Sequence, residues 1–220
     1  VGLMFQDADL GQDDFLGGRL RIWQPLRGYR AAMDPVLLAA ACPAVPGERV
    51  LELGCGAGVA SLCLGARVPD LVLTGLELQG EYAALAARNA AENGIALRVV
   101  TGDLARMPAE LRAESFDHVI MNPPYFPAGS GTEARDAGRE AGQREATPLS
   151  DWLRQGFRRL QPRGYLTVIQ NADRLPDILA GIGGQGGAIR VLPIAARAGR
   201  VAGRVIVQAR KGAKTPFTLL

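Results

Sequence analysis

The sequence has few of the residues that bind metals or form disulfides. Its 220 residues include three cysteines and one histidine, His118, and Cys42, Cys55 and Cys63 form no Cys-x-x-Cys pair. A zinc site or a disulfide framework usually draws on closely spaced pairs of such residues, so we expect neither. Cysteine usage of this kind is typical of a reducing compartment, and we expect a cytoplasmic location.

Long apolar runs are also missing. No run approaches the roughly 18 residues that a membrane-spanning helix requires, and residues 1–10 lack the basic and apolar regions of a secretory signal. We therefore expect a protein that is neither exported nor embedded in a membrane. Hydrophobic residues make up 48% of the chain and charged residues 21%, which is typical of one packed globular domain.

Lysine is rare, and positive charge is unevenly distributed. Of the 25 basic residues only Lys211 and Lys214 are lysines. Residues 1–157 have 14 basic and 20 acidic side chains, a net charge of −6, whereas residues 158–220 have 11 and 2, a net charge of +9. A basic segment on an acidic body favours binding to a polyanion such as nucleic acid. Solvated surface arginines explain the same distribution equally well, and the sequence leaves the oligomeric state open.

The pattern of the chain changes near residue 45. Residues 1–45 contain a possible β-hairpin at 15–23 and a helix at 35–41 with Asp34 as its expected N-cap. In residues 46–220, short apolar strands alternate with helical stretches, which predicts an α/β, Rossmann-like fold. We expect a mainly parallel seven-stranded sheet with helices on both faces and an antiparallel last strand. The expected strands are 50–53, 71–77, 97–101, 117–121, 164–169, 189–195 and 204–209.

A glycine-rich loop follows the first of these strands. Gly54, Cys55, Gly56 and Gly58 lie between strand 50–53 and a helix, and Glu52 precedes them. Glycines at alternate positions permit a tight turn and let a ligand approach the backbone, while the helix N-terminus offers unpaired N–H groups. The loop is typical of a nucleotide-type site, although a purely structural turn can use the same glycines.

Two further acids end neighbouring strands. Glu77 ends the second strand, where its carboxylate can accept both hydroxyl hydrogens of a ribose. Asp103 follows the third strand and can accept from an adenine amino group. Ordinary helix-start roles remain open for both acids. Leu78 and Leu104, which follow them, complete this part of the expected cofactor site.

The glycine loop and the two acids together resemble the class I S-adenosylmethionine-dependent methyltransferases, over roughly residues 49–209. The resemblance implies that the loop cradles the methionine moiety of the cofactor, that Glu77 holds its ribose and that Asp103 contacts its adenine. A dinucleotide-dependent dehydrogenase is the competing interpretation of the loop. No hydride-transfer constellation in the sequence supports it.

The sequence Asn122-Pro123-Pro124-Tyr125 follows the fourth strand, at the edge where the loop and the acids lie. Two prolines cannot continue a central strand, so the chain leaves it rigidly. This rigidity sets the Asn122 amide oxygen and the Pro123 carbonyl as two converging acceptors, which suits an amino group with two hydrogens. Both acceptors would offset positive charge that develops on the nitrogen during methyl transfer.

The residues after this turn are candidates for substrate binding. Pro124, Tyr125 and Phe126 are expected to contact a planar substrate, with the aromatic rings stacking on it. Arg135 and Arg139, in the following loop, are expected to contact phosphates, although a charged loop without that role is equally compatible.

Asn-Pro-Pro-Tyr after such a strand looks like the signature shared by adenine-N6 and protein-glutamine methyltransferases. The glutamine enzymes have a helical domain ahead of the catalytic domain, and the 45 or so residues here are too few for one. The segments 24–30 and 34–39 instead resemble the bacterial tRNA adenine-N6 methyltransferases, which modify the adenine beside the anticodon of a valine tRNA. That resemblance implies that Gln24, Tyr29 and Asp34 line or brace the methionine end of the cofactor site.

We therefore expect an enzyme that uses S-adenosylmethionine to methylate an exocyclic amino nitrogen, with adenine N6 in tRNA as the leading substrate. The alternatives are a protein-glutamine N5 methyltransferase and a catalytically silent nucleic-acid-binding module of the same fold. The expected partner is RNA, and no membrane or metal is expected.

Overall fold

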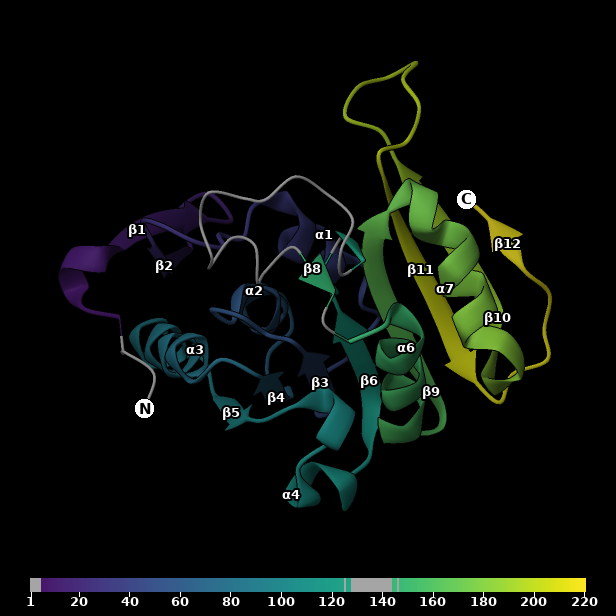
Figure 1. Cartoon of the computed structure of the whole chain (residues 1–220), viewed down its shortest axis with the longest axis horizontal. Coiled ribbons are helices and arrows are strands. Elements are labelled where there is room, and N and C mark those ends of the chain that lie inside the picture. The colour runs from purple at the N-terminus through teal and green to yellow at the C-terminus, as the bar shows by residue number, and fades with distance from the viewer. Residues whose placement is uncertain (1–4, 125, 128–143, 146) are drawn as a thin grey trace.

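The computed structural model describes residues 5–124, 126–127, 144–145 and 147–220. Its main sheet has the strand order β12-β10-β11-β9-β6-β3-β4-β5 (Figure 1). Neighbouring strands are parallel except at β11, which is antiparallel to both β9 and β10. The strands are β3 Arg49–Leu53, β4 Val72–Glu77, β5 Leu97–Thr101, β6 Phe116–Met121, β9 Leu160–Asn171, β10 Gly186–Ile194, β11 Arg204–Lys211 and β12 Thr218–Leu219.

The mainly parallel α/β fold is thereby confirmed. The expected antiparallel strand is present, and the two-residue strand β12 adds an eighth, edge position beside β10. β9 begins four residues earlier than the sequence indicates, at Leu160, which pairs with Phe116 of β6, and the three residues that follow Leu160 are exposed.

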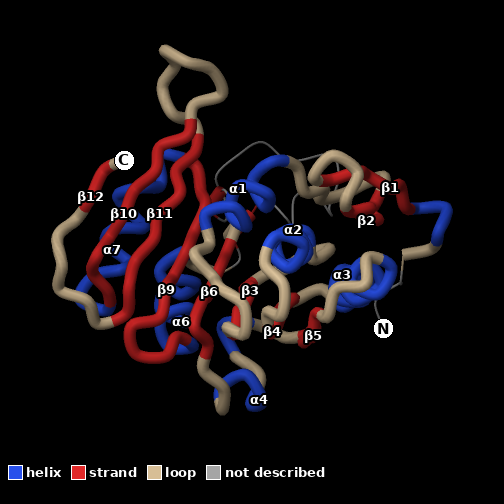
Figure 2. The backbone as a smooth tube through the Cα atoms, turned by 180° about the vertical axis from the view of Figure 1, so that it is seen from behind, coloured by secondary structure: helices blue, strands red, loops and turns tan. Residues whose placement is uncertain are grey.

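Helices cover both faces of this sheet. α6 and α7 lie on the face turned to the viewer in Figure 1, and α1 and α2 lie on the opposite face, seen in Figure 2. The helices are α1 Met33–Ala41, α2 Val59–Arg67, α3 Gly80–Glu92, α4 Ala109–Arg112, α6 Leu149–Arg159 and α7 Leu175–Ile182, with 3-10 turns η1 Asp7–Asp9, η2 Leu104–Arg106, η3 Ala172–Arg174 and η4 Gly183–Gln185. None of the described helices is long and apolar enough to cross a bilayer.

The hydrophobic core has two layers, because successive side chains of a strand point to opposite faces. Leu51 and Leu53 of β3 pack with Leu153 and Phe157 of α6. Val50, which precedes Leu51, packs instead in the cluster that α1, α2 and α3 form on the other face. A strand covered on both sides reads as a continuous apolar run, which is why most of these strands could be located in the sequence.

The first 45 residues form a hairpin and a helix. β1 (Leu10–Phe15) and β2 (Leu20–Pro25) are antiparallel, so the expected hairpin is confirmed, with strands that extend further than residues 15–23. The prediction that Asp34 caps the following helix is wrong. α1 begins at Met33 after Ala32, no side chain caps it, and Asp34 lies in its first turn. The Asp34 carboxylate instead accepts a 2.9 Å ion-pair contact from Arg204 Nε of β11, which ties α1 to the sheet.

Candidate active site

The glycine loop turns sharply between β3 and α2. Gly54, Gly56 and Gly58 have φ of 69°, 53° and 85°, the left-handed region that side chains disfavour. A Cβ on Gly54 would lie 2.6 Å from the Trp152 ring of α6, so the turn packs directly against that indole. The loop also sits closely on β4, because a Cβ on Gly75 would meet the Cys55 sulfur at 2.6 Å. The positive φ angles and the close packing both require glycine at these positions of the loop.

Glu77 binds the glycine loop from the end of β4. The Gly56 N–H donates to its Oε2 at 2.8 Å, and the Gln79 N–H donates to its Oε1 at 2.9 Å. Burial raises the pKa of Glu77 above its ordinary value, against the opposing effect of these two donors. Each carboxylate oxygen has a second lone pair, so the group can hold the loop and still accept further hydrogen bonds.

Glu52 lies on the buried side of the same pocket. Its Oε2 accepts from the backbone N–H of Ser61, at 3.0 Å, and from the Ser61 hydroxyl. Burial raises the pKa of Glu52 to about 8, so the carboxyl is largely protonated at neutral pH. Burial, together with Glu52 and Glu77, also raises the pKa of the neighbouring Cys55 thiol, which is therefore neutral.

Asp103 and Leu104 border the pocket from the end of β5. The Asp103 carboxylate caps η2, accepting from the Ala105 N–H at 2.8 Å, and it pairs at 3.4 Å with Arg106. The N-cap role that the sequence left open is therefore real. It leaves the side chain at the pocket, where its remaining lone pairs are available.

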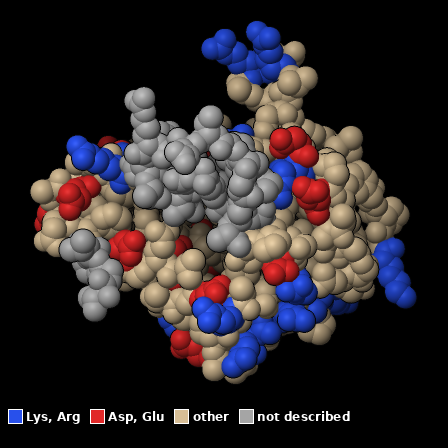
Figure 3. All heavy atoms as spheres, in the orientation of Figure 1, with Lys and Arg blue, Asp and Glu red and all other residues tan. Residues whose placement is uncertain are grey.

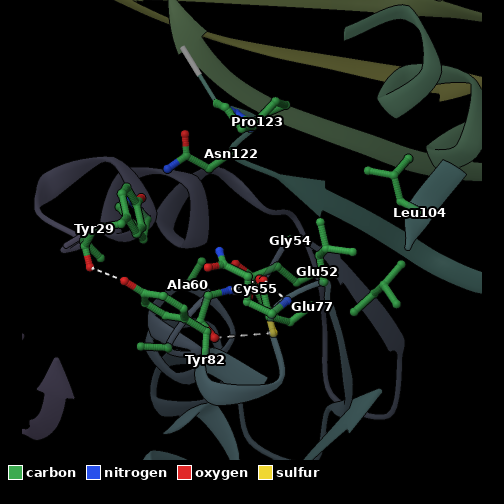
Figure 4. A pocket seen from close by; sticks show the side chains of 18 of the residues that line it. Tyr29, Glu52, Gly54, Cys55, Ala60, Glu77, Tyr82, Leu104, Asn122 and Pro123 are labelled. Carbon is green, nitrogen blue, oxygen red and sulfur yellow. Dashed lines mark hydrogen bonds between the residues drawn. The ribbon is translucent and has the colours of Figure 1, made fainter. Parts of the chain in front are cut away.

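The Asn-Pro-Pro turn forms another wall. Asn122, Pro123 and Pro124 line the pocket, and Figure 4 shows Asn122 and Pro123 on one side of it, opposite Tyr82 and Cys55. The Asn122 Oδ1 atom is buried and has no hydrogen-bond partner among the described residues. A buried amide oxygen without a donor is costly, and at a pocket it points to a ligand that donates.

The turn is anchored by a residue of the neighbouring strand. Gln170 of β9 is fully buried, and its side-chain amide donates to the Pro123 carbonyl at 3.2 Å and to the Pro124 carbonyl at 3.3 Å. Its own Oε1 accepts from the Asn171 N–H at 2.8 Å. The two prolines have no N–H, so their carbonyls are the backbone groups through which the turn can be anchored, and Gln170 supplies the donors for them.

The N-terminal segment closes the remaining side. Gln24 and Tyr29 both line the pocket. The Gln24 amide accepts from the Ala31 N–H at 2.7 Å and donates to Asp13 at 2.8 Å, so it braces the chain that carries Tyr29. The Tyr82 hydroxyl of α3 donates to the Tyr29 carbonyl at 3.1 Å (Figure 4).

A family model for the methyltransferase small domain matches residues 34–182, about two thirds of the chain. The chain belongs to this methyltransferase family. The family assignment expected from the glycine loop and the Asn-Pro-Pro-Tyr sequence is thereby confirmed.

Individual relatives of this methyltransferase are similar over shorter or longer stretches. A tRNA1(Val) (adenine(37)-N6)-methyltransferase of Yersinia enterocolitica is 37% identical over 117 residues, which are 51% of this chain and 47% of the relative. A protein of the same name from Porphyromonas gingivalis is 31% identical over 175 residues, 76% of this chain and 68% of the relative. The aligned parts thus span about half to two thirds of these relatives.

Solved structures also resemble the methyltransferase. A protein described as a predicted O-methyltransferase from Agrobacterium tumefaciens superposes with a TM-score of 0.68 at 30% identity, covering 85% of each chain. Its backbone arrangement supports the class I methyltransferase fold that the strand order shows.

Most of the residues expected at the site meet in this one pocket of the methyltransferase. Gly58 and Asp34 are not among its lining residues: Gly58 is the N-cap of α2, and Asp34 pairs with Arg204. Tyr125, Arg135, Arg139 and the Phe126 side chain lie outside the described residues. The expected residues that line the pocket are Gln24, Tyr29, Glu52, Gly54, Cys55, Gly56, Glu77, Leu78, Asp103, Leu104, Asn122, Pro123 and Pro124.

Sequence reasoning missed several participants. Gln79, Tyr82 and Thr147 line the pocket, and Trp152 both packs on Gly54 and lines it. The first two follow Glu77 closely in the chain, which is the one signal that could have suggested them. Gln170 carries no such signal, because a single glutamine at the end of a strand does not reveal what it faces.

Proposed function

We propose that this methyltransferase transfers a methyl group from S-adenosylmethionine to the N6 amino group of an adenine in tRNA. The observation that carries the proposal is the buried Asn122 Oδ1, which has no hydrogen-bond partner among the described residues and lies beside the Pro123 carbonyl. The relatives from Yersinia and Porphyromonas are named as tRNA adenine-N6 methyltransferases, which supports adenine as the acceptor and tRNA as the substrate. A tRNA substrate also implies a cytoplasmic location.

The lining of the pocket fits S-adenosylmethionine. The glycine loop offers close backbone approach at a helix N-terminus, Glu77 has lone pairs for ribose hydroxyls, and Asp103 has them for an adenine amino group. The cofactor supplies an electrophilic methyl group on a positively charged sulfur. That charge favours the ionised form of Glu52, whose pKa burial otherwise raises.

The two segments of the chain have distinct parts in this proposal. Residues 1–45 form an extension that closes the methionine end of the pocket through Gln24 and Tyr29. Residues 46–220 form the methyltransferase domain, with the glycine loop, the acids and the Asn-Pro-Pro turn at the carboxyl ends of its parallel strands.

The acceptor chemistry belongs to the Asn-Pro-Pro turn. The Asn122 amide oxygen and the Pro123 carbonyl accept the two N–H hydrogens of the target amino group, which draws its nitrogen toward tetrahedral geometry. As that nitrogen gains positive charge, both oxygens stabilise the charge without having to reorient. The nitrogen loses its extra proton to water afterwards, so no strong base is needed beforehand.

The target base needs a flat surface beside these acceptors. Pro124 lines the pocket there, and we assign base stacking to Tyr125 and Phe126 and phosphate contact to Arg135 and Arg139. Stacking on an aromatic ring is the usual way in which proteins hold an unpaired or flipped base.

The variant Asn122→Ala tests the role of the amide. Because it removes one of the two acceptors, we expect kcat for methyl transfer to tRNA to fall by at least about 100-fold. Affinity for S-adenosylhomocysteine, measured by calorimetry, should stay within a few-fold, because the glycine loop and the acids are unchanged.

Asn122→Asp is the matched control. It keeps an acceptor oxygen of similar size in the same place, so measurable turnover should remain. Undiminished turnover in Asn122→Ala would contradict the assigned role of the amide.

A further inference from the structure

A second pocket, distinct from the cofactor pocket, is lined by arginines. It lies between the η2–α4 segment and the last turn of α6, and Arg106, Arg112, Arg158 and Arg159 all line it. None of the described residues that line it is an aspartate or a glutamate. Figure 3 shows Lys and Arg side chains gathered over α4 and the lower end of α6 on this face of the molecule.

These arginines are poorly neutralised by the protein itself. Among the described residues, Arg106 alone of these four arginines has an ion pair, a 3.4 Å contact with Asp103, and the Arg106 side chain is 89% exposed. Arg112, Arg158 and Arg159 have no ion pair within the part of the chain that the structure describes. Such a cluster repels itself and lowers the stability of the folded state unless an anion binds to it.

The guanidinium of Arg159 is only partly satisfied by hydrogen bonds within the described part of the chain. Its Nη1 donates to the Leu111 carbonyl at 2.7 Å, which joins the end of α6 to the end of α4. Its Nε is buried and has no acceptor among the described residues. A buried guanidinium N–H without an acceptor is costly, so the contact with Leu111 does not satisfy this side chain.

Arg159 lies in an unfavourable electrostatic environment. Burial lowers the pKa of Arg159, and the nearby charges of Arg158 and Arg112 lower it further. Burial and the charge of Arg159 likewise lower the pKa of Lys211. Basic residues in the last turn of α6 are also stabilised by the negative end of its helix dipole. That effect does not account for Arg106 and Arg112, which belong to other elements.

We propose that this pocket binds a phosphate group of the RNA substrate through Arg106, Arg112, Arg158 and Arg159. Guanidinium groups match phosphate oxygens in both charge and hydrogen-bond geometry. The inference rests on the proposed function, since it assigns the phosphate to the RNA that is methylated. A free phosphate ion has the same chemistry, and the experiment below separates the two sources.

The position of the pocket suits a backbone contact near the methylated base. Asp103 and Leu104 line the cofactor pocket, and Ala105 and Arg106 line the arginine pocket, so the two share one continuous segment. α6 also joins them, with Trp152 at the first and Arg159 at the second. The helix has 11 residues and is about 16 Å long, so a strand whose base enters the active site needs only a few nucleotides to reach the arginines.

The double variant Arg112→Gln/Arg158→Gln tests the proposal in the full chain. Both side chains are exposed and neither lines the cofactor pocket. With an unmodified tRNA transcript as substrate, we expect KM for the RNA to rise about tenfold and the slope of log affinity against log salt to weaken by about one to two. kcat and the affinity for S-adenosylhomocysteine should stay within twofold.

A control and a second measurement complete the test. Arg21→Gln/Arg190→Gln removes the same charge from exposed positions on other elements and should leave KM unchanged. The arginine-pocket variant should melt at a higher temperature than the wild type, because repulsion is relieved, and inorganic phosphate should raise the melting temperature of the wild type more than that of the variant.

The outcomes separate the possible failures. An unchanged KM and salt slope in the arginine-pocket variant, while the wild type methylates tRNA, overturns the proposal. Loss of the phosphate-induced shift with an unchanged KM assigns the pocket to a free anion and overturns the RNA assignment. If the wild type itself methylates no RNA, the proposed function fails, and the phosphate site is then judged by the melting measurement alone.

Discussion

At the scale of single residues, the direction of the two proline carbonyls depends on one buried amide. Gln170 donates to both carbonyls, so the two prolines, which have no N–H, are held from the neighbouring strand β9. The Pro123 carbonyl retains a second lone pair, which the proposed function assigns to the target amino group. Gln170 is therefore a positioning residue for the acceptor chemistry, although it does not itself line the pocket.

Replacing this amide should slow catalysis without affecting the cofactor. In Gln170→Leu the two carbonyls lose their donors, and we expect kcat to fall by about 10- to 100-fold, equivalent to roughly 1–3 kcal/mol. Affinity for S-adenosylhomocysteine should be unchanged, because the glycine loop lies on β3. Steady-state kinetics and calorimetry measure the two quantities.

Gln208→Leu is a suitable control for this variant. Gln208 also donates from a strand, to the Ala41 carbonyl at 2.7 Å, but it does not contact the Asn-Pro-Pro turn. Its replacement should lower stability and leave kcat unchanged. Equal loss of kcat in both variants would mean that Gln170 acts only through general stability.

The buried Glu52 predicts a pH dependence of stability. Its pKa is about 8 in the folded protein and near 4.5 when exposed, so between these values the folded state binds more protons than the unfolded state. The stability that this group contributes is therefore complete below about pH 4.5 and is lost as the pH rises towards 8. In Glu52→Gln the decline in unfolding free energy between pH 5 and pH 8 should be shallower. Denaturant titrations at both values check this, and parallel declines in the two proteins would refute it.

At the scale of elements, the hairpin is joined to α3 by two asparagine side chains. Asn89 accepts from the Trp23 N–H at 2.8 Å and donates to the Trp23 carbonyl at 3.0 Å. Asn93, one helical turn later, makes the corresponding two bonds with Arg21, at 2.9 and 2.8 Å. The side-chain amides thus pair with alternate residues of β2 as a neighbouring strand would, and they satisfy its edge.

Asn89 also connects this junction to the cofactor site, because it donates to the Ala57 carbonyl of the glycine loop at 3.0 Å. Asn89→Ala should lower the free energy of unfolding by about 1–3 kcal/mol and weaken binding of S-adenosylhomocysteine. Denaturation and calorimetry measure these effects. Asn93→Ala is the control, since it loses the bonds to Arg21 and to the Asn89 carbonyl but no hydrogen bond to the glycine loop, and it should bind the cofactor product normally. Equal affinity of both variants for S-adenosylhomocysteine would contradict the role of Asn89 in cofactor binding.

The elements that the sequence predicts well are those with a local signal. β5 has the predicted bounds, and β3, β4 and β6 differ from them by one residue, because each is a short apolar run bounded by polar residues. β9 is predicted too short, since Gln161, Pro162 and Arg163 are exposed and give no apolar signal, although Leu160 before them already pairs with Phe116 of β6. The N-cap assignment of Asp34 failed for a similar reason: its partner, Arg204, lies 170 residues away.

The residues of the candidate site likewise divide into those with a local sequence signal and those without one. The glycine loop, Glu77 and the Asn-Pro-Pro turn have local sequence patterns, and they meet because parallel strands end at one edge of the sheet. Gln170 and Tyr82 contribute through contacts that only the folded chain creates.

At the scale of the whole molecule, the distribution of charge in the folded protein differs from its distribution along the sequence. The sequence divides into an acidic part and a basic part near residue 157. In the folded protein, Arg106 and Arg112 of the acidic part lie with Arg158 and Arg159 in one basic pocket. Glu77 and Asp103 line the cofactor pocket, so an acidic site for a cation and a basic site for phosphate lie side by side.

The most direct test of the account is to identify the methylated product. The protein is incubated with S-adenosylmethionine carrying a labelled methyl group and with unmodified tRNA, and the RNA is digested to nucleosides and analysed by mass. We expect label in N6-methyladenosine, and incorporation at least about 100-fold slower with Asn122→Ala. Label in another nucleoside or in a glutamine side chain of a protein, or no transfer to RNA at all, would contradict it.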